Sequence, residues 1–147
     1  MTRDPVQRRL RDSLYSEAML LADEARGYFD EPGRADSAAL DPLARVRFSC
    51  ESLKVTTRLM HVLAWLLTQR GVDAGEIAPT EALKPSRRLG EGPASEPDEL
   101  DVLPPRAREL AEASLDLHRR VARLDRDYAE PVESPARAML DRLSQAF

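Results

Sequence analysis

Apolar positions near the start of the chain follow the spacing of a helix. They recur every three or four residues from Val6 to Tyr28, which places them on one stripe. Asp4 and Pro5 favour a helix start, and Pro32 with Gly33 favours a stop. The pattern predicts a helix over about 5–30, with the stripe Val6, Leu10, Leu14, Ala18, Leu21, Ala25 and Tyr28. The following segment EPGRADSAAL is expected to be a loop.

A second and longer helix is predicted over about 42–71. Asp41 can cap its first amides, Pro42 suits the first helical position, and Gly71 favours an end. Two apolar faces run along it, almost opposite each other. The first is the heptad seam Leu43, Val46, Cys50, Leu53, Thr57, Met60, Ala64 and Leu67; the second is Phe48, Val55, Leu59, Val62 and Leu66.

A helix with two opposed apolar faces must be covered on both. We expect the first seam to pack against the other helices of the bundle. The second face is then the candidate homodimer interface, formed by Phe48, Val55, Leu59, Val62 and Leu66. Two alternatives remain at this stage: the face is covered within one chain by residues 139–147, or by the folded-back linker.

A narrow polar row separates the two faces. It reads Arg47, Glu51, Lys54, Arg58, His61, Trp65 and Gln69, and the tryptophan is out of place among charged residues. Trp65 can cover the linker from below, or it can anchor a binding partner beside Arg58, because Trp and Arg dominate interaction hot spots. The candidate partner-binding residues are Arg58, His61, Trp65 and Gln69.

The C-terminal half combines a polar linker with two more helices. Gly, Pro and acidic residues over about 72–103 predict a mobile linker, above all at 85–99. A heptad pattern predicts a helix over about 104–130, with Asp116 and Arg120 paired on its outer face. A last short helix is expected over about 135–146. The heptad is Leu103, Ala107, Leu110, Ser114, Leu117, Val121, Leu124 and Tyr128, and the last stripe is Met139, Leu140, Leu143 and Phe147.

These elements and the composition predict one all-α domain over residues 1–147. Aromatic residues make up only 5%, which suits helices packed through Leu, Val and Ala. No alternating strand pattern of useful length occurs. We expect an antiparallel three-helix bundle, up-down-up, with a long central helix, a flexible linker between the second and third helices, and a short C-terminal helix.

Charge and candidate chemistry argue against several function classes. The net charge of −4 disfavours nucleic acid and anionic membrane surfaces. The apolar run at 59–67 is too short to span a bilayer, and no signal-peptide pattern opens the chain, so we expect a cytoplasmic protein. His61, His118 and the single Cys50 form no catalytic or metal-binding motif. We therefore expect no enzyme activity, no cofactor and no metal, and we expect Cys50 to be a small core residue.

The stretch ESLKVTTRLMHVLAWLLTQRGVDAGEI, residues 51–77, resembles the RcdA-type family, regulators of CtrA degradation in alphaproteobacteria. The Thr-Thr-Arg-Leu-Met run, the Trp-Leu-Leu one turn later and the Gln-Arg pair carry the match. The resemblance implies a dimeric three-helix bundle without catalytic activity, an adaptor that helps the ClpXP protease engage cell-cycle substrates. The matched residues Thr56, Thr57, Arg58, Trp65, Gln69 and Arg70 would hold the helix and its dimer seam or contact a partner.

Neither the cargo nor the part played by a response regulator or second messenger follows from the resemblance. A different function also fits the residues. In that alternative, the chain is a helical dimer that binds a small apolar ligand, or a scaffold unrelated to proteolysis.

Overall fold

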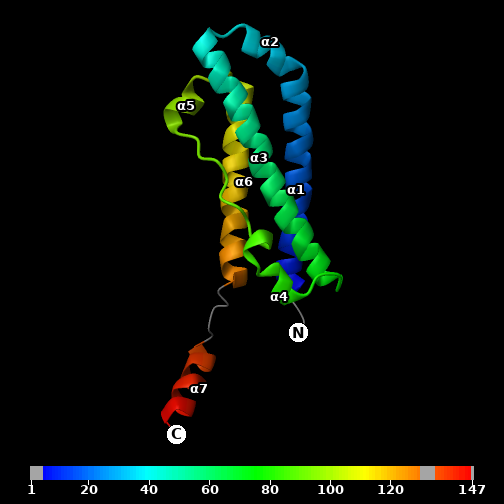
Figure 1. The fold of residues 1–147 in the computed structure, drawn as a ribbon, viewed down its shortest axis with the longest axis vertical. Coiled ribbons are helices and arrows are strands. Elements are labelled where there is room, and N and C mark those ends of the chain that lie inside the picture. Colours follow the sequence, from blue (N-terminus) through cyan, green and yellow to red (C-terminus); the bar gives the residue numbers. More distant parts are fainter. Residues whose placement is uncertain (1–4, 130–134, 147) are drawn as a thin grey trace.

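The computed structural model describes residues 5–129 and 135–146. Every regular element in these ranges is helical, which confirms the all-α class (Figure 1). Each element begins with a proline, whose fixed φ and missing N–H suit the first helical turn. The elements are α1 (Pro5–Asp30), α2 (Pro32–Ala38), α3 (Pro42–Asp73), α4 (Pro79–Ala82), the 3₁₀ turn η1 (Pro85–Arg87), α5 (Pro97–Asp101), α6 (Pro105–Ala129) and α7 (Pro135–Ala146).

The three long helices α1, α3 and α6 form the bundle, but α6 does not run in the expected direction. Hydrogen bonds join Arg58 to Ser114 and Trp65 to Asp125, so residue numbers rise together along α3 and α6. The two helices are therefore parallel, and α1 alone runs opposite to them (Figure 1). The up-down-up order is corrected to up-down-down, because the linker returns along the whole bundle before α6 begins.

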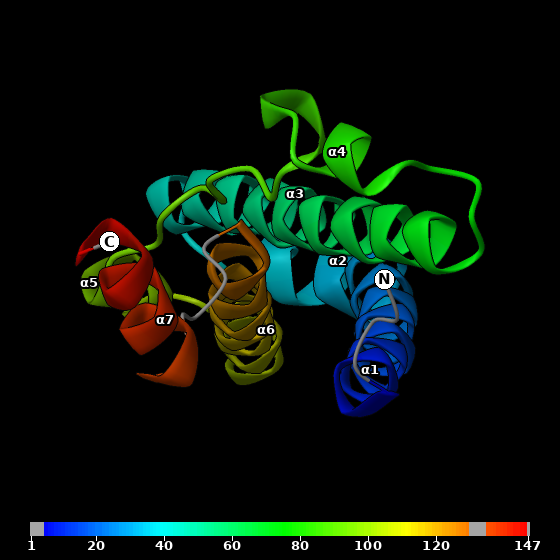
Figure 2. The same cartoon turned by 90° about the horizontal axis from the view of Figure 1, so that it is seen from below.

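The linker of residues 74–104 follows a defined path along α3 and α6 (Figures 1 and 2). It carries α4, η1 and α5, and hydrogen bonds fix it at Arg88, Gly90, Pro93, Ser95 and Glu99. The expectation of a loose connection over 85–99 is corrected. Polar side chains of the bundle bind the linker where its own composition supplies little apolar surface.

Local signals explain the element ends. The Asp41 carboxylate accepts a hydrogen bond from the Ala44 amide at 2.9 Å, the predicted cap. The helix continues through Gly71 to Asp73, and Ile77 folds back onto Gly71, leaving no room for a larger side chain there. The expected loop before α3 contains the short helix α2 instead. Tyr28 Oη donates to Asp36 at 2.6 Å, and this bond ties α2 to the end of α1.

The core lies between α1, α3 and α6. The predicted α6 seam is buried from Leu103 to Val121, while Leu124 and Tyr128 are half-buried against it. In α1, Leu14, Ala18, Ala25 and Tyr28 of the stripe are buried and Leu21 is half-buried, whereas Val6 and Leu10 are exposed. Figure 2 shows why α3 is central: α1 and α6 both lie on the same side of it.

Helix α7 follows the bundle beyond the end of α6 (Figure 1). Met139, Leu140 and Leu143 are each at least half exposed, so they do not cover α3 as the single-chain alternative required. Phe147 lies outside the described residues.

Candidate interaction surface

The structure reverses the two apolar faces of α3. The face predicted to meet a second chain is packed inside its own chain: Phe48, Val55, Leu59, Val62 and Leu66 are exposed by only 0–6%. The seam predicted to face the bundle is on the outside, where Leu43, Val46, Leu53, Met60 and Leu67 are 50–68% exposed. The assignment of Phe48, Val55, Leu59, Val62 and Leu66 to a dimer interface is therefore corrected: they form the intrachain core.

The polar row beside the core explains this choice. Glu51, Arg58 and Trp65 are buried, and they need polar partners across the interface. They find them on α6 and on the linker, as described below. The opposite orientation of α3 would separate these groups from those partners. The orientation that is observed takes no polar partner away from the residues of the exposed seam. The second face is part of the core formed with α1 and α6, so these residues are not exposed to a ligand.

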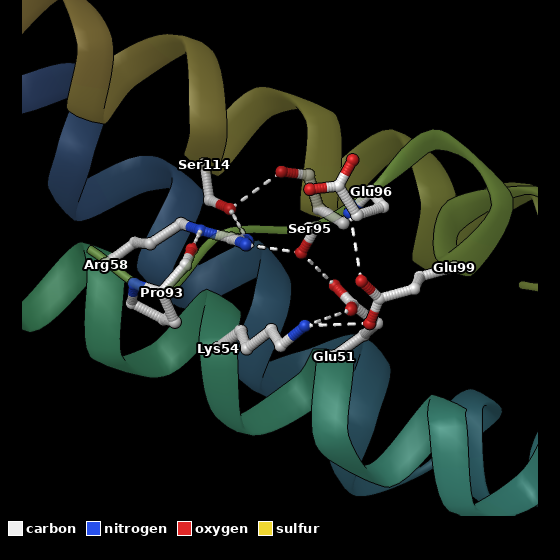
Figure 3. A network of polar contacts seen from close by, with 9 residues as sticks. Glu51, Lys54, Arg58, Pro93, Ser95, Glu96, Glu99 and Ser114 are labelled. Atoms are coloured by element: carbon white, nitrogen blue, oxygen red, sulfur yellow. Dashed lines mark hydrogen bonds and ion pairs between the residues drawn. The ribbon is translucent and has the colours of Figure 1, made fainter.

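Arg58 joins α3 to α6 and the linker (Figure 3). It is 1% exposed, and it donates from Nε to the Pro93 carbonyl at 3.0 Å and from Nη1 to Ser114 Oγ at 3.1 Å. Nη2 donates to Ser95 Oγ. Burial lowers the pKa of Arg58, and the nearby carboxylates of Glu51 and Glu99 act against that effect. The planar guanidinium therefore binds three groups on two elements at once.

The same network continues to α5. Ser95 Oγ donates to Glu51 at 2.6 Å, and Lys54 Nζ bridges Glu51 at 2.9 Å and Glu99 at 3.1 Å. Burial acts against the charge of Lys54, but the two carboxylates outweigh it and raise the pKa of Lys54. The pKa of Glu99 is lowered, first by the Glu96 backbone amide and then by Lys54. Figure 3 shows that these residues fix the start of α5 over α3.

Trp65 is buried and bonded to α6. Its Nε1 donates to Asp125 Oδ1 at 2.9 Å, and Arg88 of the linker binds both oxygens of the same carboxylate, at 2.8 and 2.9 Å. Trp65 therefore lies beneath the linker, as one of its two interpretations required. The interpretation as an exposed partner anchor is corrected, because the ring is only 2% exposed.

The two histidines lie close together under the linker. Their ring centroids are 6.4 Å apart, and His118 Nε2 is 3.0 Å from the Gly90 carbonyl oxygen. A Cβ added at Gly90 would lie 3.1 Å from the His61 ring, and one at Gly92 would lie 3.1 Å from His118. Glycine lets the linker backbone rest directly on both rings. Burial lowers the pKa of His118, and the neighbouring His61 and Arg58 lower it further, against the Gly90 hydrogen bond.

Three of the four predicted partner-binding residues belong to the inside of the molecule, and the fourth lies partly at its surface. Arg58, Trp65 and Gln69 are buried and His61 is half-buried, so their assignment to a partner surface is corrected. The structure does bring Arg58, His61 and Trp65 together, against the linker. Their partners Ser95, Arg88 and Asp125 were not predicted from the sequence. One signal was present: Ser114 is a polar residue at a core position of the α6 heptad, which indicates a buried polar partner.

An open cavity of about 570 Å³ remains where the linker leaves α4. Trp65, Leu67, Ile77 and Pro85 form its apolar wall, with Ser86 and Arg87 at the side. Among the described residues, no group of three or more His, Cys, Asp or Glu is arranged to hold a metal ion. No helix in the described ranges has the length and apolar character that crossing a membrane requires.

Among the described residues, the outer seam of α3, here called the α3 seam, is an exposed apolar surface that suits a partner. It consists of Leu43, Val46, Cys50, Leu53, Thr57, Met60, Ala64 and Leu67, and its alternating spacing of three and four holds without a break. Cys50 is exposed there, which corrects its assignment to the core. A contiguous apolar stripe of this length on a protein surface marks an interaction site.

Comparisons with known proteins agree with the fold. A family model described as "Protein of unknown function (DUF1465)" matches residues 2–147. Among solved structures, the crystal structure of RcdA from Caulobacter crescentus CB15 superimposes with a TM-score of 0.68 at 35% sequence identity, over 81% of this chain and 90% of that chain. This chain belongs to the RcdA-type family. A search of curated proteins finds no significant match.

Membership in the RcdA-type family confirms the resemblance seen at residues 51–77. Of the residues that carried it, Arg58, Trp65 and Gln69 are now placed in the core and beneath the linker, whereas Thr57 is half-buried on the α3 seam and Thr56 and Arg70 are exposed. In this RcdA-type chain, the recognisable block therefore holds the bundle together on one side and presents the seam on the other.

Proposed function

We propose that this RcdA-type protein is a non-enzymatic, homodimeric adaptor of the cytoplasm, which helps deliver cell-cycle substrates to the ClpXP protease through protein–protein contacts. The α3 seam is the observation that carries the proposal. It is a long apolar surface with heptad spacing, and this pattern is the one that helices use to bind other helices. Family membership supplies the adaptor role.

The α3 seam suits a second copy of the chain. Leu43, Val46, Leu53, Met60 and Leu67 are at least half exposed on each protomer. Burying a side chain of this kind contributes about 1.5–3 kcal/mol. Since these side chains are already about one third to one half buried, two sets contribute correspondingly less than the full value, a gross gain comparable to an association cost on the order of 4–15 kcal/mol. The homodimer therefore stays our proposal, with its interface moved to the opposite face of the same helix.

Homodimerisation leaves other surfaces for cargo and protease. The outer faces of α1 and α6 carry exposed, mixed charges, for example the ion pairs Arg106–Glu24 and Arg120–Glu17 that join the two helices. Exposed pairs of this kind contribute little to stability. The side chains of these ion pairs can therefore bind a charged partner with little loss of stability. Each ion pair is present twice in the dimer.

Sedimentation equilibrium over a concentration series tests the dimer. The wild type is expected near twice 16.5 kDa, and Leu53→Asp near 16.5 kDa with unchanged helical circular dichroism. Arg123→Asp, on the exposed side of α6, is the matched control and should remain dimeric. A wild-type monomer at every concentration would contradict the homodimer and leave the adaptor role to be decided separately.

Degradation in a cell lysate tests the adaptor role. Lysate from a strain that lacks this chain is incubated with added ClpXP, with and without the purified protein, and protein half-lives are followed by quantitative mass spectrometry. We expect a small set of proteins to disappear faster only when the wild type is present. Unchanged half-lives throughout, together with no retention of ClpX on immobilised protein, would refute delivery to this protease.

A further inference from the structure

The open cavity between α3 and the linker beside η1, here called the η1 cavity, is formed within a single chain. Its volume of about 570 Å³ lies in the range of small-molecule pockets, roughly 300–1,000 Å³. On one side α3 contributes Trp65 and Leu67, and on the other the linker contributes Ile77, Pro85 and Arg87. The η1 cavity is therefore large enough for a small organic molecule.

Contacts at both ends hold the linker side of the η1 cavity in place. Ile77 packs on Gly71 so closely that a Cβ added at this glycine would lie 2.6 Å from Ile77 Cδ1. After η1, Arg88 binds both carboxylate oxygens of Asp125, at 2.8 and 2.9 Å. The linker is thus tied to the bundle before and after the cavity. A site whose walls are already in position loses less free energy to ordering when a ligand binds.

The linker side of the η1 cavity also carries a positive charge. None of the residues that line the cavity is acidic, although the whole chain has a net charge of −4. Two neighbouring cations are already paired, Lys84 with Glu81 at 2.6 Å and Arg88 with Asp125. Arg87 is exposed, and within the described residues its guanidinium forms no salt bridge or hydrogen bond. Arg87 can therefore bind an anionic group in the cavity.

The α3 side of the η1 cavity supplies a second polar group. His61 lines the cavity, and its Nδ1 atom is buried without a hydrogen-bond partner among the described residues. Buried polar atoms are nearly always paired in folded proteins. A neutral imidazole can donate or accept at this atom, so a polar atom of a bound molecule can supply the partner.

We propose that the η1 cavity binds a small molecule that joins an aromatic or other apolar body to one anionic group, such as a carboxylate. The apolar body packs on Trp65, Leu67 and Ile77, and Arg87 binds the anionic group. This site lies within one chain, so it does not depend on the homodimer or on the adaptor role. Leu67 also belongs to the α3 seam, and for this reason the test compares the wild type with a seam variant.

Fluorescence tests the site, because Trp65 is the only tryptophan and lines the cavity. The probe is anilinonaphthalenesulfonate, an aromatic molecule with one anionic group. Excitation of Trp65 should give sensitised emission of the bound probe that saturates at one probe per chain. Arg87→Ser should weaken binding of this probe about tenfold, since a hydrogen bond to a charged group is lost. Binding of phenylnaphthylamine, which lacks the sulfonate, should be the same in the wild type and in Arg87→Ser.

Three further variants locate the probe. Ser86→Phe adds a ring at the exposed side of the cavity and should abolish the sensitised emission, with unchanged helical circular dichroism. Leu53→Asp, on the α3 seam, and Arg123→Ser, exposed on α6, should bind the probe as the wild type does.

Two outcomes would overturn the proposal. Loss of binding in Leu53→Asp, with binding retained in Ser86→Phe, would place the probe on the α3 seam. Absence of sensitised emission from the wild type, or equal affinity of the wild type and Arg87→Ser for the sulfonate, would show that the η1 cavity does not bind an apolar anion. Neither outcome bears on the homodimer, which sedimentation measures separately.

Discussion

The indole of Trp65 donates to the carboxylate of Asp125 at 2.9 Å, and this bond fixes the register of α3 against α6. Arg88 of the linker binds the same carboxylate from the other side. The Asp125 side chain of α6 therefore binds both α3 and the linker.

Replacing the Asp125 carboxylate should lower the free energy of unfolding by more than the loss of a single hydrogen bond would. Asp125→Ala leaves the Trp65 N–H and the Arg88 guanidinium without their shared acceptor, and we expect a loss of about 3 kcal/mol in the free energy of unfolding. Urea denaturation measures the loss. Asp127→Ala, two residues away and exposed, should change the value by less than about 0.5 kcal/mol. Equal effects of the two substitutions would mean that the Asp125 contacts contribute nothing specific.

Adjacent residues of α3 should respond in opposite ways to the same substitution. Leu59 is 4% exposed and Met60 is 64% exposed. Leu59→Asp buries a charge in the core and should unfold the protein, at a cost above about 4 kcal/mol. Met60→Asp should keep the helical circular dichroism and the monomer stability, while sedimentation shows loss of the dimer. A folded Leu59→Asp variant would show that the core does not contain this face of α3.

Two glycines in helices form a matched pair for thermal denaturation. A Cβ at Gly33 would lie 2.8 Å from the Tyr28 carbonyl oxygen, whereas one at Gly27 meets nothing within 4 Å. Gly27→Ala should stabilise the protein by up to about 1 kcal/mol, since alanine is the better helix former. Gly33→Ala should lower the melting temperature, because the backbone of α2 must move. If both variants gained stability, α2 would not pack closely on the end of α1.

Acidification should loosen the linker through His118. Its pKa is lowered chiefly by burial and then by His61 and Arg58, so the folded protein binds this proton less readily than the unfolded chain. Stability is therefore unaffected above the unfolded pKa of about 6.5 and falls as the pH drops below it, by at most about 1.4 kcal/mol per pH unit. Urea denaturation between pH 7.5 and pH 5.5 measures the slope. His118→Gln, which does not titrate, should reduce it; an unchanged slope would assign the effect to other groups.

Much of the fold could be predicted from local patterns. The bounds of α1 and α6, the cap at Asp41 and the buried α6 seam follow from spacing and from proline at each helix start. These features depend on residues a few positions apart, so the sequence carries them directly. The short helix α2 was missed, because its support comes from Asp36 binding Tyr28 across a turn.

The sequence by itself determined that α3 has two apolar faces. It could not determine which face lies inside, because both have helical spacing and similar residues. Tertiary structure decided this through groups distant in sequence: Arg58 with Ser114, Trp65 with Asp125, and Glu51 with Ser95. Buried polar groups must be paired, and only one orientation of α3 pairs them. That orientation also requires the linker to cross the bundle, and it leaves the α3 seam on the surface.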